Sequence, residues 1–157
     1  MKAPFPLPNI VLKDVRAAHP RDVLRHMTDA LELADGANAP DLMKVLMDAE
    51  MTGGSAIGDG VAVVSARVAS SVTPRRLCAF AQLAKPVAFR GVEQHPCDLV
   101  FVMVSPDNET QAHLRDLSIV IRTLRDRDFL DRLRRAQNPE RASHLFQARD
   151  IAMTQAA

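Results

Sequence analysis

The length and composition of the chain indicate one globular domain. Its 157 residues are 47% hydrophobic and 25% charged, which is enough apolar material for a single sizeable core. The formal net charge is only +1. No global field therefore points to nucleic acid or to an anionic membrane as a partner, and partners have to be inferred from local features.

The N-terminal segment does not have the pattern of an export signal. Pro4, Pro6 and Pro8 interrupt it, and no apolar stretch of signal-peptide length is present. The longest apolar run, residues 98–106, has the length of a strand and is far short of the roughly 20 residues that span a bilayer. We expect a cytoplasmic protein without membrane insertion, in which residues 1–8 form an arm and the fold starts near Asn9.

Two helices are predicted in the first third of the chain. The first begins at Pro20 and stops at Gly36, because proline favours the first turn of a helix and glycine its end. Its apolar residues recur at helical spacing: Val23, Met27, Ala30, Leu31 and Ala34. A shorter helix over residues 39–51 has Pro40 in its first turn and an apolar side.

Three strands are predicted next, at residues 60–68, 75–83 and 97–106, because these segments are short, apolar and bounded by Gly, Pro or charged residues. In the run DLVFVMV at residues 98–104, the residues that follow Asp98 are apolar in succession rather than in alternation, which suits a central strand covered on both faces. We expect its odd-numbered residues to pack under one helical layer and its even-numbered residues under the other: Leu99, Phe101 and Met103 against Val100, Val102 and Val104.

Further helices are predicted in the last third of the chain. Residues 110–126 carry apolar side chains spaced for a buried stripe: Leu114, Leu117, Ile121 and Leu124. Residues 128–147 read as two helices broken at Asn138-Pro139. The order of helices, then strands, then helices favours the α+β class, with a three-layer α/β/α arrangement.

Generic site chemistries fit poorly. The histidines are scattered, and only His19 and His26 share a helix neighbourhood, without a convincing third ligand. We therefore expect neither a metal ion nor a cofactor. Cys78 and Cys97 lie in or beside apolar segments without CxxC spacing, so they are predicted to be buried free thiols.

Two other patterns carry a functional and a structural interpretation. Ser65, His113 and Asp116 could be combined into a hydrolase triad, but the sequence around Ser65 lacks the G-x-S-x-G elbow. A charged cluster near the C-terminus is more typical of a solvated, salt-bridged helix face than of a nucleic-acid footprint. It consists of Arg132, Arg134 and Arg135 mixed with Asp126, Asp128 and Asp131.

Several short segments match one family pattern, in one order and at matching separations. They are Glu50, IGDGVAV at residues 57–63, KPVAF at 85–89, HPCDLVF at 95–101 and HLRDLS at 113–118. On these segments the chain resembles the nitrogen-regulatory enzyme IIA family of the phosphoenolpyruvate-dependent phosphotransferase system, related to fructose- and mannitol-type IIA domains. The resemblance is clear from about Leu46 to Phe146, and it implies a phosphotransferase-system IIA-like domain over residues 9–150, followed by a tail at 151–157.

The resemblance implies a mixed sheet between helical layers and a function in phosphoryl relay. Members of the family take a phosphoryl group from an upstream histidine phosphocarrier onto an active-site histidine, and that histidine aligns with Ser65. Other departures cluster there: Val64 stands for a proline, Ala66 for a glycine, Ala49 for an arginine, and residues 54–56 read GSA where the family reads STG.

The resemblance also implies the remaining site residues. His113 would hydrogen-bond the phosphohistidine as a supporting histidine, or it is kept only for packing at a helix end. We expect Ser65 and His113 to lie near one another at one edge of the sheet. The residues expected to line the phosphate pocket are Gly58, Gly60, Ser55 and Arg67.

Serine at the acceptor position decides between the possible functions. An imidazole forms a phosphoramidate that can release the phosphoryl group again, whereas a serine hydroxyl needs a base and gives a stable ester. The leading hypothesis is a regulatory protein-binding module that is constitutively unphosphorylated, with a histidine phosphocarrier, a kinase or a transporter as its partner. The alternatives are an active phosphocarrier that uses His113 or Ser65, and a small-molecule-binding protein that reuses the pocket.

Overall fold

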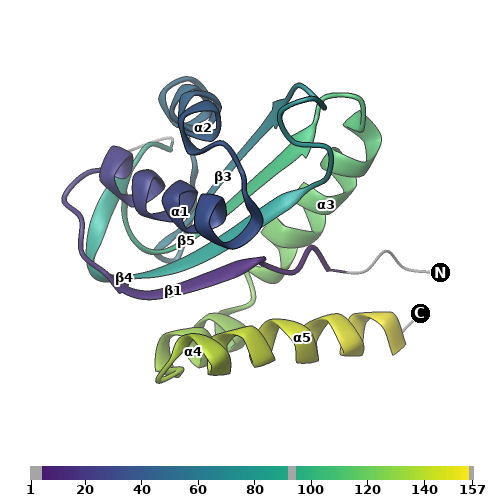
Figure 1. The fold of residues 1–157 in the computed structure, drawn as a ribbon. Helices are drawn as coiled ribbons and strands as arrows, with labels where there is room; N and C mark the ends of the chain where they lie inside the picture. The colour runs from purple at the N-terminus through teal and green to yellow at the C-terminus, as the bar shows by residue number, and fades with distance from the viewer. Residues whose placement is uncertain (1–4, 92–94, 156–157) are drawn as a thin grey trace.

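The computed structural model describes residues 5–91 and 95–155. Within these ranges no helix is long and apolar enough to cross a membrane. Among the described residues, five strands form one sheet and five helices pack around it. Figure 1 shows their arrangement. In chain order they are β1 (Ile10–Val15), α1 (Pro20–Asp35), α2 (Ala39–Gly53), β2 (Ala56–Gly58), β3 (Val61–Val68), β4 (Leu77–Phe89), β5 (His95–Pro106), α3 (Thr110–Thr123), α4 (Arg127–Arg135) and α5 (Pro139–Gln155).

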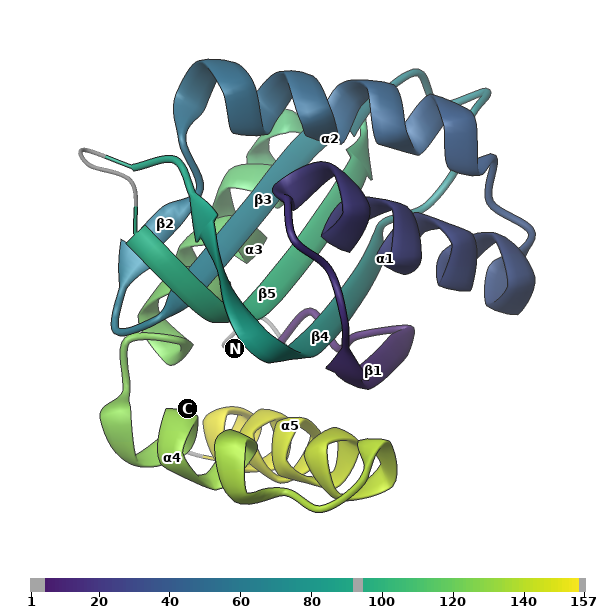
Figure 2. The ribbon, with the colours of Figure 1, turned by 90° about the vertical axis from the view of Figure 1, so that its left-hand side faces the viewer.

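The sheet is mixed, with the strand order β1-β4-β5-β3-β2. The central strand β5 runs antiparallel to β4 and parallel to β3, and both edge strands pair with a single neighbour. Helices α1 and α2 cover one face, whereas α3, α4 and α5 lie on the other side (Figures 1 and 2). The predicted α+β class with its three layers is confirmed.

Strand β5 separates two hydrophobic cores. Val100, Val102 and Val104 pack in the core under α1 and α2. Leu99, Phe101 and Met103 pack in the core on the α3, α4 and α5 side. Because successive side chains of a strand point to opposite faces, an unbroken apolar run can fill both cores at once. The predicted layer assignment of this strand is confirmed.

The predicted boundaries of the helices follow from their caps. Helix α1 begins at Pro20, and Gly36 ends it in the left-handed conformation with φ 70°. The Asn38 side chain accepts a hydrogen bond from the backbone N–H of Asp41 at the start of α2, at 3.1 Å. Asn138 accepts one from Arg141 at 2.9 Å, which marks the predicted break between α4 and α5.

The predicted buried stripe of α3 is confirmed at Leu124, which is fully buried in the core on the α3 side, and it is wrong at Leu114. Leu114 is 60% exposed, while Leu117 and Ile121 are only partly buried. The side of α3 that faces the protein also carries His113, Asp116, Val120 and Thr123. Hydrophobic spacing cannot reveal this orientation, because polar side chains are buried where partners satisfy them, and those partners come from distant segments.

Some strands differ from the prediction. β1 and β2 were not predicted, because β1 is irregular around Asp14, with φ 57°, and β2 has only three residues inside the glycine-rich segment. β4 extends to Phe89, beyond the predicted end at residue 83. Its pairing with β5 shifts register between Gln82 and Val87, and this irregularity accommodates a proline that would interrupt a regular ladder.

Part of the predicted N-terminal arm contributes to the core. Phe5 is 2% exposed, and its ring lies 5.6 Å from that of Phe146 and 6.1 Å from that of Phe101. Its backbone N–H donates to Asp150 at 2.7 Å. Helix α5 continues past residue 150 to Gln155. Residues 1–4 and 156–157 lie outside the described residues, and the boundaries at 8 and 150 stay predictions.

Both cysteines are free and buried, as predicted. Burial is the main reason that the pKa of Cys78 rises to about 12 and that of Cys97 to about 11. Since the thiolate is the reactive form, neither side chain has the properties of a nucleophile.

Truncation of a buried side chain of the central strand β5 should show how much the stability of the fold depends on this strand. Phe101→Ala removes a fully buried ring from the core on the α3 side, so we expect the free energy of unfolding to fall by about 3–5 kcal/mol in chemical denaturation. Leu33→Ala is the control, because Leu33 is 92% exposed on α1, and it should change stability by less than about 0.5 kcal/mol. Equal stability of the two variants would contradict the central role of β5.

Candidate functional site

Strand β3 presents Ser65 and Arg67 on the face covered by α3. In the parallel ladder Ser65 lies opposite Met103, and Arg67 lies opposite Ser105. Met103 belongs to the core on the α3 side, so the alternation of the strand places Ser65 on that side as well. Ser65 is half-buried and Arg67 is exposed, at the carboxyl end of β3.

The first turn of α3 meets these two strands. His113 Nδ1 lies 2.9 Å from Ser105 Oγ on β5, and Arg67 Nη1 of β3 donates to Thr110 Oγ1 at 2.6 Å. His113 is only 7% exposed. The structure thus brings Arg67, Ser105 and His113 together around the start of α3, with Ser65 on the same face of the sheet. The expected close approach of Ser65 and His113 stays a prediction.

The environment of His113 favours the neutral imidazole. Burial is the main cause that lowers the pKa of His113 below its ordinary value, and the positive charge of Arg67 lowers it further. Asp116 opposes the shift. Desolvation disfavours the charged form of an imidazole, so His113 is uncharged near neutral pH.

A buried ion pair completes this end of the sheet. The Asp116 carboxylate, 3% exposed, accepts a hydrogen bond from Arg76 Nη1 at 2.6 Å, and Arg115 Nε lies 3.6 Å from its other oxygen. The hydrolase triad considered from the sequence is therefore not assembled in this form. Asp116 is bound by arginines, and His113 uses Nδ1 for Ser105 rather than for Asp116.

The glycines expected in the phosphate pocket lie elsewhere. Gly58 and Gly60 flank the turn between β2 and β3, where Asp59 has φ 55°, and β3 then runs five residues to Ser65. At about 3.3 Å per residue, this places Gly60 about 16 Å from Ser65. Gly58 and Gly60 therefore do not lie in one pocket with Ser65. Both have positive φ in the hairpin turn between β2 and β3, which explains why they are glycines.

Arg134 fills the space that Gly60 leaves open. A side chain at Gly60 would place its Cβ 2.7 Å from Arg134 Nη2. Arg134 binds Asp98 of β5 through two hydrogen bonds of 2.9 and 2.8 Å, and it donates to the Asp59 carbonyl at 2.5 Å. The hydrogen bond to Asp98 is also the main cause that raises the pKa of Arg134. This arginine therefore fastens α4 to the sheet rather than forming part of a solvated face.

Ser55 belongs to an anchor between α2 and β4. Its N–H donates to the Arg90 carbonyl at 2.6 Å, and its own carbonyl accepts from Val63 at 2.9 Å. The buried Glu50 accepts a hydrogen bond from the Arg90 N–H at 2.8 Å, and burial raises the pKa of this carboxyl. A Cβ at Gly54 would lie 3.3 Å from the same Arg90 carbonyl, so the close approach explains this glycine.

Across residues 5–148 the chain matches the family of the phosphoenolpyruvate-dependent sugar phosphotransferase system, EIIA 2. The chain belongs to this family. Among its relatives are the nitrogen regulatory proteins of Klebsiella oxytoca, 32% identical over 67% of this chain and 64% of that protein, and of Bradyrhizobium diazoefficiens, 26% identical over 85% and 86%. The matched region thus spans less than two thirds of the Klebsiella protein.

The solved structures agree with this assignment. The crystal structure of nitrogen regulatory protein IIA-Ntr from Neisseria meningitidis is 25% identical, with a TM-score of 0.78. The superposition covers 90% of this chain and 95% of that one. The chain therefore has the same overall fold as that IIA-Ntr structure.

Sequence reasoning missed two side chains of this EIIA 2 domain, Ser105 and Arg76. Ser105 follows the long apolar run, and nothing in the sequence indicates that it faces His113 across a turn. Arg76 lies just before β4 and pairs with a residue 40 positions away. The sequence signal for Arg76 is Asp116, which lies three residues after His113 and therefore on the same helix face. If that face is buried, the acid needs a cationic partner.

The titration of His113 should show the predicted environment. In NMR titrations we expect the chemical shifts of its ring protons to report a pKa below the ordinary value of about 6.5. Arg67→Gln should raise this pKa, because it removes a positive charge that lowers it. Arg122→Gln, at an exposed position on the same helix, is the control and should leave it unchanged.

The same shift sets a dependence of stability on pH. The unfolded chain binds the His113 proton more tightly than the folded chain does. The contribution of His113 to the free energy of unfolding is therefore fully present above the ordinary histidine pKa, and it is lost as the pH falls through the folded pKa. His113→Gln should remove this part of the acid loss. An unchanged pH profile in the Gln variant would contradict a neutral, buried His113.

Proposed function

We propose that this EIIA 2 protein is a regulatory, protein-binding module in which position 65 does not accept a phosphoryl group. The observation that carries the proposal is Ser65 on β3, at the position that the sequence pattern aligns with the acceptor histidine. The relatives named nitrogen regulatory proteins support a regulatory role. We also propose a cytoplasmic location, which the lack of an export-signal pattern near the N-terminus supports.

The chemistry of the site supports the loss of relay function. A serine hydroxyl requires a base to attack phosphorus, and its ester does not release the phosphoryl group as a phosphoramidate does. The candidate base of the family pattern, His113, has its Nδ1 engaged by Ser105. Ala49 adds no positive charge at the position where the family pattern has arginine, although charge neutralisation carries much of phosphoryl transfer.

A module of this kind would bind its partner in one fixed state. Phosphorylation adds a charge of about −1.5 to −2 at neutral pH and thereby changes which surfaces are complementary. Without an acceptor, that charge never forms at this site, and binding is not switched by the relay. A histidine phosphocarrier, a kinase or a transporter is the class of partner that the family relationship suggests.

One observation favours a second candidate function, a phosphocarrier that uses His113. The neutral imidazole is the nucleophilic form, and the lowered pKa of His113 makes that form dominant at neutral pH. Arg67 is available beside it as a positive charge. Against this, His113 is only 7% exposed, so a partner histidine has little access to its ring.

Phosphorylation with labelled phosphoenolpyruvate and the upstream phosphocarriers tests the proposal. The parent protein should take up no acid-labile phosphate, whereas Ser65→His should gain it, because the imidazole restores a reversible acceptor on the same scaffold. Ser65→Ala is the matched control and should gain nothing. Adding Ala49→Arg to Ser65→His should increase the rate further.

The other outcomes identify the alternatives. Acid-labile phosphate on the parent protein that disappears in His113→Gln would assign the relay to His113 and overturn the proposal. Acid-stable phosphate that disappears in Ser65→Ala would make Ser65 an acceptor, which overturns it as well. Mass spectrometry of the labelled peptide distinguishes the two cases.

A further inference from the structure

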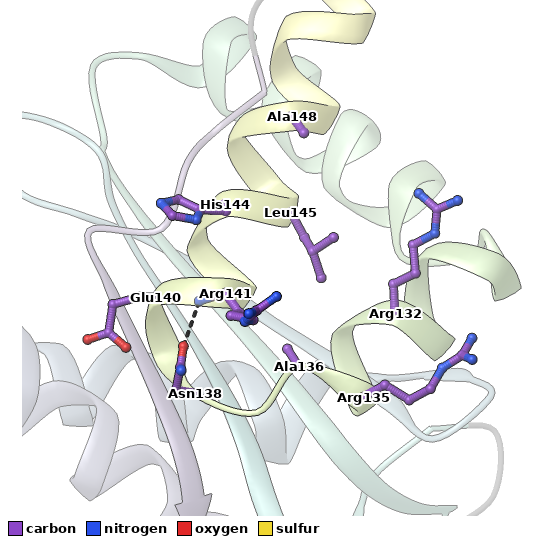
Figure 3. Close-up of a pocket in the computed structure, with 9 residues that line it drawn as sticks. All are labelled: Arg132, Arg135, Ala136, Asn138, Glu140, Arg141, His144, Leu145 and Ala148. Atoms are coloured by element: carbon purple, nitrogen blue, oxygen red, sulfur yellow. Dashed lines mark hydrogen bonds between the residues drawn. The ribbon is translucent and has the colours of Figure 1, made fainter.

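A groove of about 780 Å³ lies between the end of α4 and the first turns of α5 (Figure 3). Its floor is apolar. Leu145 points from α5 toward α4 in Figure 3, Ala136 is buried in the connection between the helices, and Ala148 continues the apolar side one turn after Leu145. The groove is open to solvent and holds none of the residues of the candidate site around His113.

The rim of the groove is basic. Arg132 and Arg135 flank it from α4 and Arg141 from α5, and all three are exposed. Within residues 5–91 and 95–155 none of these guanidinium groups forms an ion pair, whereas Arg134 of the same helix is bound to Asp98. Glu140 is the acidic side chain among the described residues that line the groove.

We propose that this groove binds an acidic, amphipathic segment of a partner protein. An apolar side chain of that segment would cover Leu145 and Ala136, and carboxylates beside it would pair with Arg132, Arg135 and Arg141. Arginine favours such pairing because its planar group binds a carboxylate through two parallel hydrogen bonds. The apolar floor and the unpaired charges together define the complementary ligand.

Other occupants fit the groove less well. Nucleic acid is bound mainly by extended positive surfaces that neutralise phosphates, while this chain has a net charge of only +1 and the groove has an apolar floor. A second copy of the chain that docked the same groove about a two-fold axis would bring like charges together, because such an interface must be self-complementary.

The proposal is independent of phosphoryl transfer. The groove is formed by α4, α5 and their connection, and neither Ser65 nor His113 lines it. It adds a binding surface to the proposed function rather than explaining the site on β3. Ser65→His should therefore leave ligand binding in the groove unchanged, so failure of one proposal does not imply failure of the other.

Selection of random displayed 12-residue peptides on the full chain tests this surface. The selection is run in parallel on the double variant Arg132→Glu with Arg141→Glu and on Arg25→Glu. Arg25 is an exposed arginine of α1 in the opposite helical layer, so this control matches the change in residue type. Synthetic copies of the enriched peptides are then titrated by fluorescence anisotropy at two salt concentrations.

We expect the peptides enriched on the parent protein to contain several acidic residues around an apolar one. Their dissociation constants should rise at least about tenfold in the double variant and in high salt, and stay unchanged in Arg25→Glu and Ser65→His. Amide shifts in NMR should map to α4 and α5.

Several results would overturn the proposal. One is the absence of any peptide that prefers the parent protein to the double variant. Another is enrichment of peptides without acidic residues. Equal or tighter binding of a single-stranded oligonucleotide to the same groove would assign it to nucleic acid, and self-association that the double variant abolishes would assign it to a second copy.

Discussion

Burial of β5 on both faces is the constraint on which the rest of the structure depends. The apolar residues 99–104 of this strand are fully buried, alternately in the two cores. A strand of this kind is stable only if a helical layer covers each face and a neighbour pairs with each edge. The layers, the strand order and the position of β3 beside β5 all satisfy that requirement. The candidate site lies where β3 and β5 both end, beneath the start of α3.

The orientation of α3 rests on polar contacts as well as on the apolar packing of Val120 and Leu124. His113 and Asp116 turn toward the protein because Ser105 and Arg76 satisfy them, and the helix consequently leaves Leu114 exposed. Buried polar groups without partners are strongly unfavourable. The pairs therefore favour one rotation of the helix, and this rotation buries the His113 ring beside Arg67, where its pKa is lowered.

The sequence predicted what depends on local patterns and missed what depends on distant pairing. Pro20, Gly36 and Asn138 mark helix ends through local capping, and the apolar run of β5 identifies a central strand by itself. By contrast, the direction of His113 depends on Ser105, and the fit of Gly60 depends on Arg134, 74 positions away. The family resemblance implies a phosphate pocket for Gly58 and Gly60. A glycine-rich segment is compatible with both a hairpin turn and an anion-binding loop, and only the register of β3 distinguishes the two.

The short helix α4 shows how one charged segment can serve both the fold and recognition. Phe129, Leu130 and Leu133 bury its apolar side, and this sets the rotation of the helix. With about 100° between successive residues, the same rotation turns Arg134 toward Asp98 while its neighbours Arg132 and Arg135 remain at the surface. The packing of the apolar side of α4 therefore determines both roles: Arg134 binds the β2–β3 turn, and Arg132 and Arg135 line the groove. In the amino-acid sequence the three arginines look like a single basic cluster.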